Sequence, residues 1–211
     1  MSKIRMEDFI LAFKDREPGL IGSYNYYSVL VPLVEKDDEL HILYEVRSDN
    51  LTKQPGEVCF PGGRMEKGET PEQCAIRETS EELNISENDI KVIAQMDYMH
   101  TYSNFTMYAF LGTIDYEVLK KTTVNPDEVK EIFMVPVEYL MVSEPEIYSF
   151  DVIPDVGEDF PYEKINSKVG YNWRKGKSVI PIYQYDDRVI WGLTGRITCN
   201  LIRILQHKNK G

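Results

Sequence analysis

Three glutamates lie close together in one short stretch of the sequence, at Glu78, Glu81 and Glu82. The stretch is predicted to be a helix, because Thr70 suits its N-cap and Pro71 its first position. Residues three and four apart are neighbours on a helix surface, so the carboxylates are expected to share one patch. Mg²⁺ and Mn²⁺ prefer oxygen ligands and commonly combine carboxylates with substrate phosphates. The spacing therefore predicts that these glutamates bind Mg²⁺ or Mn²⁺.

An arginine and a glycine-rich loop adjoin the acidic residues. Arg77 stands four residues before Glu81 and can brace one carboxylate while metal ions occupy the others. Ahead of the helix, Gly62 and Gly63 lack side chains, so their backbone can approach a phosphate or a metal closely. Glu69 adds a further acid before the cap. The alternative, from the residues alone, is a solvated acidic helix face with an ion pair.

The order of these residues resembles the Nudix box, the signature of hydrolases that cleave nucleoside diphosphates linked to another moiety. The matching residues are Gly63, Glu69 and the run RETSEELNI from Arg77 to Ile85. Thr79 stands where an aliphatic residue is usual and Asn84 where glycine is usual, but the spacing of the acids is kept. The resemblance implies the α/β class, as a Nudix-type α/β/α sandwich with a mixed central β-sheet over about residues 24–206. It also implies that Gly63 offers its backbone to a metal.

A second resemblance lies just before the box. The segment RSDNLTKQPGEVCFPGG is similar to the corresponding segment of the coenzyme A pyrophosphatase subgroup, on the matching residues Arg47, Ser48, Gly56, Phe60, Pro61, Gly62 and Gly63. The subgroup's second basic residue would fall on Thr52, and Lys53 is the nearest base here. The resemblance implies that Arg47, Lys53, Gly62 and Gly63 contact substrate.

A general base is expected on a loop outside the box. The coenzyme A subgroup often has an Asn, acidic, Glu-Val run that resembles residues 125–129, so Glu128 is the leading candidate. Asp127 and a box glutamate remain alternatives. The predicted catalytic residues are Glu78, Glu81, Arg77 and Glu128.

The predicted reaction is metal-assisted hydrolysis of a pyrophosphate bond. By resemblance, the substrate is coenzyme A or acyl-CoA, giving adenosine 3′,5′-bisphosphate and phosphopantetheine or its acyl derivative. ADP-ribose or another nucleoside diphosphate sugar is the alternative substrate, because the box residues do not decide between them. A different class of protein, a non-catalytic nucleotide-sensing module with the same fold, is the other alternative. The presence of all the predicted metal-binding glutamates argues against it.

The composition restricts the partners of the chain. Its 211 residues fit a single domain, 1–211, with a possible insertion at 144–177 that could cover the site or make a homodimer contact. The net charge of −11 argues against nucleic-acid binding, capped RNA included, because such binding depends on lysine and arginine. No apolar run is long enough to span a membrane, and a cytoplasmic location is expected by default. Three cysteines without zinc spacing are expected to be reduced and mostly buried.

The remaining elements must position these groups. We expect Trp191 to be a core residue at the start of the last helix, where Trp191-Gly192-Leu193-Thr194 resembles the coenzyme A subgroup. Hydrophobic periodicity and turn residues predict strands at 24–34, 40–47, 91–97, 105–114, 132–135, 179–185 and 188–191, and helices near the N-terminus and at 71–83. The resemblance to the coenzyme A subgroup implies a short helix at 137–141 and a last helix that runs to about 206, with an apolar stripe of Leu193, Ile197, Leu201, Ile204 and Leu205.

Overall fold

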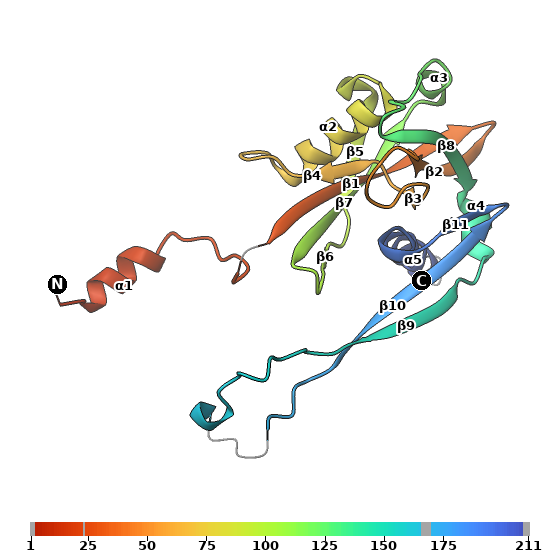
Figure 1. Cartoon of the computed structure of the whole chain (residues 1–211). Coiled ribbons are helices and arrows are strands. Elements are labelled where there is room, and N and C mark those ends of the chain that lie inside the picture. Colours follow the sequence, from red (N-terminus) through yellow and green to blue (C-terminus); the bar gives the residue numbers. More distant parts are fainter. Residues whose placement is uncertain (1–2, 23, 166–169, 209–211) are drawn as a thin grey trace.

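The computed structural model describes residues 3–22, 24–165 and 170–208, and a mixed β-sheet lies at its centre (Figure 1). Its strands run in the order β3-β2-β1-β7-β5, with β4 paired to β1, β6 to β7 and β8 to β2. Strand β1 runs parallel to β7, and the other pairs are antiparallel. The bounds are β1 (Asn25–Lys36), β2 (Glu39–Arg47), β3 (Val58–Cys59), β4 (Gly62–Arg64), β5 (Ile90–Gln95), β6 (Met99–His100), β7 (Phe105–Ile114) and β8 (Val129–Pro136). The predicted mixed α/β architecture is confirmed.

Helix α2 (Pro71–Leu83) covers one face of this sheet. It begins at a capping box, in which the amide of Gln73 donates to Thr70 Oγ1 at 3.2 Å and the amide of Thr70 donates to Gln73 Oε1 at 2.9 Å. It ends at Asn84, whose φ of 57° is left-handed, as predicted for this position. Apolar residues of α2 pack with Leu30, Leu43 and Phe110 of the sheet. Local sequence therefore fixes both ends of α2, and its buried side fixes its rotation.

Helix α5 (Gly192–Lys208) covers the opposite face, together with α4 (Val137–Val142), and completes the sandwich (Figure 1). Ile197, Leu201 and Ile202 of α5 join the core on this side. The buried Tyr44 hydroxyl lies 3.0 Å from Thr198 Oγ1 and ties β2 to α5. The predicted last helix is confirmed, although Ile204, assigned to its apolar stripe, is exposed.

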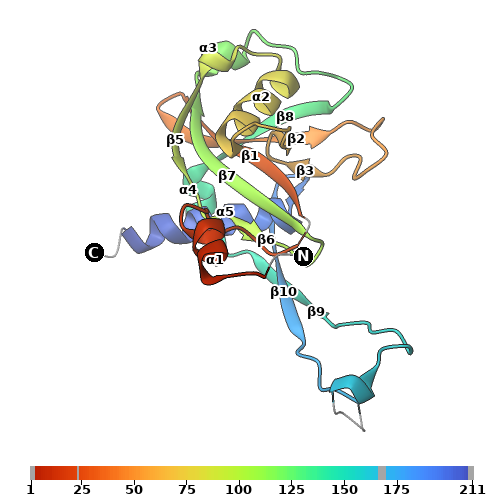
Figure 2. The ribbon, with the colours of Figure 1, turned by 90° about the vertical axis from the view of Figure 1, so that its left-hand side faces the viewer.

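The segment 144–177, which the sequence left unassigned, contains a long β-ribbon. Strand β9 (Glu146–Val152) pairs with β10 (Gly176–Tyr185), which pairs in turn with β11 (Arg188–Ile190). The two long strands extend away from the body in both views (Figures 1 and 2). Every residue of β9 except the half-buried Val152 is exposed, so its apolar side chains do not give the buried pattern by which strands are recognised.

The prediction that Trp191 belongs to the core is wrong, because its side chain is 41% exposed. Trp191 lies between β11 and α5, just before Gly192, whose φ of +63° turns the chain into the helix. It lines the cavity described below.

The remaining described elements are short or peripheral. Helix α1 (Met6–Phe13) forms near the N-terminus as predicted, but it has no buried residue. The others are η1 (Glu87–Asp89), α3 (Tyr116–Leu119) and η2 (Tyr162–Ile165). In the ranges that the structure describes, no helix is both long enough and apolar enough to cross a membrane.

Candidate active site

Glu82 is the most deeply buried of the three predicted metal glutamates, with 4% exposure. The amide of Gly62 donates to Glu82 Oε2 at 2.7 Å, which ties helix α2 to the glycine loop. Burial raises the pKa of Glu82 well above its ordinary value, and the charge of Glu45 raises it further. Glu82 is therefore held in place by the fold and lies in a strongly anionic environment.

Glu78 lies directly against the glycine loop. A Cβ atom built on Gly63 would overlap the Glu78 carboxylate, so only glycine leaves room for it. Burial raises the pKa of Glu78, while the neighbouring Arg77 opposes that shift. Gly63 therefore lies directly beside the acidic helix, while its predicted contact with a metal stays a prediction.

Gly62 is required for a different reason. Its φ is +150°, and a Cβ there would overlap the backbone carbonyl of Ser28 on β1. The two glycines thus allow α2, β1 and the loop to meet closely enough for Glu78 and Glu82 to adjoin the loop backbone.

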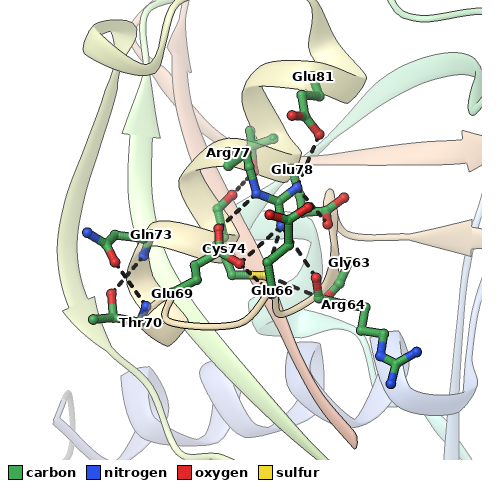
Figure 3. A network of polar contacts seen from close by, with 12 residues as sticks. Gly63, Arg64, Glu66, Glu69, Thr70, Gln73, Cys74, Arg77, Glu78 and Glu81 are labelled. Atoms are coloured by element: carbon green, nitrogen blue, oxygen red, sulfur yellow. Dashed lines mark hydrogen bonds and ion pairs between the residues drawn. The ribbon is translucent and has the colours of Figure 1, made fainter.

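Arg77 connects the carboxylates of this region, as Figure 3 shows. Its guanidinium lies 2.8 Å from Glu69 Oε1, 3.0 Å from Glu78 Oε1 and 3.1 Å from Glu81 Oε2. The bonds from Arg77 lower the pKa of Glu69 and keep that carboxylate ionised. The predicted bracing role of Arg77 matches this geometry, and it extends to Glu69 and Glu78 as well as Glu81.

The three box glutamates do not form one exposed patch, contrary to the helix-surface expectation. Glu81 is exposed, Glu78 is half-buried and Glu82 is buried. Glu82 accepts from the Gly62 amide, whereas Glu78 and Glu81 pair with Arg77. Within the described ranges, no three His, Cys, Asp or Glu side chains are gathered closely enough to hold a metal ion as they stand. Arg77 forms ion pairs with both Glu78 and Glu81.

Sequence reasoning missed a fourth acid, Glu45 on β2, which is 1% exposed. Cys59 Sγ donates to its Oε1 at 3.2 Å, but its Oε2 has no hydrogen-bond partner in the part of the chain that the structure describes. Burial raises the pKa of Glu45 to about 7. The alternation of residues along β2 could have revealed Glu45. Ile42, Tyr44 and Val46 face one side of the strand, so Leu43 and Glu45 face the other side, which is also buried.

Glu128 lies near the box glutamates although it is distant in sequence. Its charge contributes to raising the pKa of Glu45, Glu78 and Glu82. Its side chain is exposed, and its backbone carbonyl accepts from the amide of Ser48 at 2.8 Å. The loop that carries Glu128 is thereby fastened to the segment that begins at Arg47.

A cavity of about 640 Å³ opens beside the glycine loop. Arg47, Lys53, Gly62 and Gly63, the four predicted substrate contacts, all line it. Its other walls are largely apolar and include Tyr102, Phe105, Phe150, Val179, Ile180 and Leu193. Arg47 Nε is buried without a hydrogen-bond partner in the described chain. The cavity therefore joins a basic region next to Glu78 with an extended apolar region, to which the β9–β10 ribbon contributes.

The site residues fit a divalent cation in their chemistry. Glu78 and Glu82 supply carboxylate oxygens beside the glycine loop, and Glu45 Oε2, which has no hydrogen-bond partner among the described residues, adds a buried carboxylate oxygen. The free cysteines do not suggest a zinc site, because Cys74 and Cys199 are buried and Cys59 donates its hydrogen bond to Glu45.

Comparison with known proteins agrees with this geometry. Residues 25–155 match the family model described as the NUDIX domain, and the chain belongs to the Nudix family. It is 35% identical to peroxisomal coenzyme A diphosphatase NUDT7 of Mus musculus over 140 residues, which are 65% of this chain and 57% of the mouse protein. It is 38% identical to Nudix hydrolase 3 of Caenorhabditis elegans over 54% of this chain and 48% of that protein. The matches thus span about half the length of these two relatives.

A bacterial relative aligns over nearly its whole length. The uncharacterized Nudix hydrolase NudL of Photorhabdus laumondii is 27% identical over 96% of this chain and 99% of that protein. At this length the match extends beyond residues 25–155, the part that the family model covers.

Proposed function

We propose that this protein is a metal-dependent pyrophosphohydrolase that cleaves the diphosphate of coenzyme A or acyl-CoA. The products are adenosine 3′,5′-bisphosphate and phosphopantetheine or its acyl derivative. The observation that carries the proposal is a cavity lined by Arg47, Lys53 and the glycine loop, in which Gly63 lies against Glu78. The name of the mouse relative, a coenzyme A diphosphatase, supports the choice of substrate.

The basic residues of the cavity bind the diphosphate. Arg47 offers a buried Nε without a partner, and a phosphate oxygen would satisfy this donor and neutralise the charge. Lys53 is exposed on the loop that borders the cavity, so it can reach a phosphate as a mobile point charge. The apolar walls suit the pantetheine and any acyl chain.

The acidic residues hold the cation. Nudix hydrolases generally use divalent metals such as Mg²⁺ or Mn²⁺; here Glu78, Glu81 and Glu82, with the Gly63 backbone, would bind them. Such an ion supplies charge stabilisation at the phosphoryl oxygens and a more acidic water. Arg77 orients Glu78 and Glu81, and Glu128 accepts the proton of the attacking water from its exposed loop.

Substrate profiling tests the proposal. The purified protein with Mg²⁺ or Mn²⁺ is incubated separately with coenzyme A, an acyl-CoA and ADP-ribose, and the products are separated by liquid chromatography. We expect adenosine 3′,5′-bisphosphate from the first two. Cleavage of ADP-ribose alone would reject coenzyme A as the substrate, and tight binding without cleavage of any of them would identify a nucleotide-sensing module.

Replacing Arg47 with glutamine is expected to raise KM for coenzyme A by about tenfold, equivalent to about 1.4 kcal/mol, because a charged phosphate contact is lost. Steady-state kinetics measures this effect. Arg203→Gln, which removes the same charge from the exposed side of α5, is the matched control. Equal KM values for wild-type protein and Arg47→Gln would remove Arg47 from the substrate site.

A further inference from the structure

Glu45 has a carboxylate oxygen for which the fold supplies no partner. The residue is 1% exposed, its Oε1 accepts from Cys59 Sγ, and its Oε2 is buried and accepts nothing from the described residues. A buried carboxylate oxygen that is neither hydrogen-bonded nor paired costs several kcal/mol, about what a protein gains from many ordinary contacts. Such a group indicates a function that the isolated chain leaves unfulfilled.

The oxygen lies among like charges. Glu45 is on the face of β2 that packs toward α2, since its neighbour Leu43 on that face clusters with Ala75 and Leu83 of the helix. Among the neighbouring charges that raise the pKa of Glu82, that of Glu45 has the largest effect. The charges of Glu128 and Glu78 likewise raise the pKa of Glu45. Arg47 is the one cation among the groups acting on Glu45 in the described chain. Arg77, the other nearby arginine, already pairs with Glu69, Glu78 and Glu81.

We propose that Glu45 is a further carboxylate of the cation site, contributed by the sheet, which strengthens divalent-metal binding from the side opposite α2. The inference rests on the proposed metal-dependent function but does not depend on which pyrophosphate is cleaved. It explains why β2 keeps an acid on a face where Leu43 is apolar and fully buried. It also gives the Oε2 atom a direct partner, which none of the described residues supplies.

A purely structural role is the competing explanation. In that case Glu45 only accepts the hydrogen bond from Cys59 and fills space in the core. Glutamine has nearly the same shape and keeps an oxygen that can accept from the Cys59 thiol, but it carries no charge. Glu45→Gln therefore separates the two roles. Glu35→Gln is the matched control, because it makes the same change at an exposed position on the neighbouring strand β1.

The test is isothermal titration calorimetry of Mn²⁺ into substrate-free wild-type protein and both variants. We expect Glu45→Gln to weaken Mn²⁺ binding by about tenfold or more, the usual effect of losing a group that supports a metal site. Glu35→Gln should bind Mn²⁺ like the wild type. Thermal unfolding provides a second readout: without metal, Glu45→Gln should melt at or above the wild-type midpoint, because a buried charge is removed. With Mn²⁺ its midpoint should rise less than that of the wild type.

Equal Mn²⁺ affinity of Glu45→Gln and wild type would overturn the inference while leaving the proposed function intact. A lower midpoint of the metal-free variant together with unchanged affinity would establish the structural role instead. If the wild type bound no Mn²⁺, both this inference and the metal-dependent function would fail. The wild type could also bind Mn²⁺ but leave coenzyme A uncleaved. In that case, weaker Mn²⁺ binding by Glu45→Gln would uphold the inference and reject only the proposed substrate.

Discussion

Replacing Glu82 with glutamine should lower kcat by about 10³-fold and change the free energy of unfolding by no more than about 1 kcal/mol. The amide oxygen of glutamine can still accept the 2.7 Å bond from the Gly62 amide, so the junction between α2 and the loop is kept. The charge that would bind the cation is lost. Steady-state kinetics with coenzyme A and thermal unfolding of the metal-free protein measure the two quantities.

The control for Glu82→Gln is Glu72→Gln, the same change at an exposed position in the first turn of α2. It should keep wild-type turnover. A Glu82→Gln protein with near wild-type kcat would remove Glu82 from the metal site. A large fall in its unfolding midpoint would show that the lost activity reflects misfolding rather than lost chemistry.

Gly63→Ala is expected to have the second-largest effect on activity, a fall in kcat of about 10²-fold. The new methyl group would overlap the Glu78 carboxylate and displace it, and a shift of about 1 Å in a catalytic group costs about this much. Gly63 has no left-handed φ that a side chain would strain, so crowding of Glu78 is the main consequence.

Gly176→Ala on β10 is the matched control, because the nearest atom to its new Cβ, that of Val152, is at an ordinary 3.6 Å. A crystal structure of Gly63→Ala should show a displaced Glu78 side chain. Wild-type kcat/KM for Gly63→Ala would contradict the placement of Glu78 at the reacting phosphate.

The sequence predicted the elements whose signals are local. Thr70, Pro71 and Gln73 specify the start of α2 and Asn84 its end, because caps act through hydrogen bonds within a few residues. The long strands β1, β2 and β7 of the main sheet were found within a few residues, since their buried faces produce long apolar runs. The short strands β4 and β6 were not predicted. The spacing of Arg77 and the box glutamates also indicated the Nudix family, which the NUDIX domain match confirms.

Features that depend on long-range packing were not predictable from local patterns. Strand β9 has almost no buried surface, so its apolar residues could not be assigned to a core. Trp191 was expected in the core at the start of the last helix, but it is 41% exposed and lines the cavity just before the turn at Gly192. The different depths of Glu78, Glu81 and Glu82 follow from how α2 meets the glycine loop, which helix periodicity does not specify.

Glu45 shows the limit of motif-based reasoning most clearly. It lies outside the box and 37 positions before Glu82 in the printed sequence, and only the pairing of β2 with β3 and β8 brings it to the site. Arg47 and Glu128, in contrast, were predicted by resemblance, and the hydrogen bond from the Ser48 amide to the Glu128 carbonyl holds their loops together. Their chemical roles stay predictions until the variants are measured.

We propose that a divalent cation binds between the carboxylates of α2 and the glycine loop, beside the bound diphosphate. Anomalous X-ray scattering from crystals grown in millimolar Mn²⁺ would locate such an ion. We expect a manganese peak within bonding distance of Glu78 and Glu82, next to the Gly63 backbone. Well-ordered crystals with no manganese there, and with Arg77 still paired to Glu78 and Glu81, would contradict it.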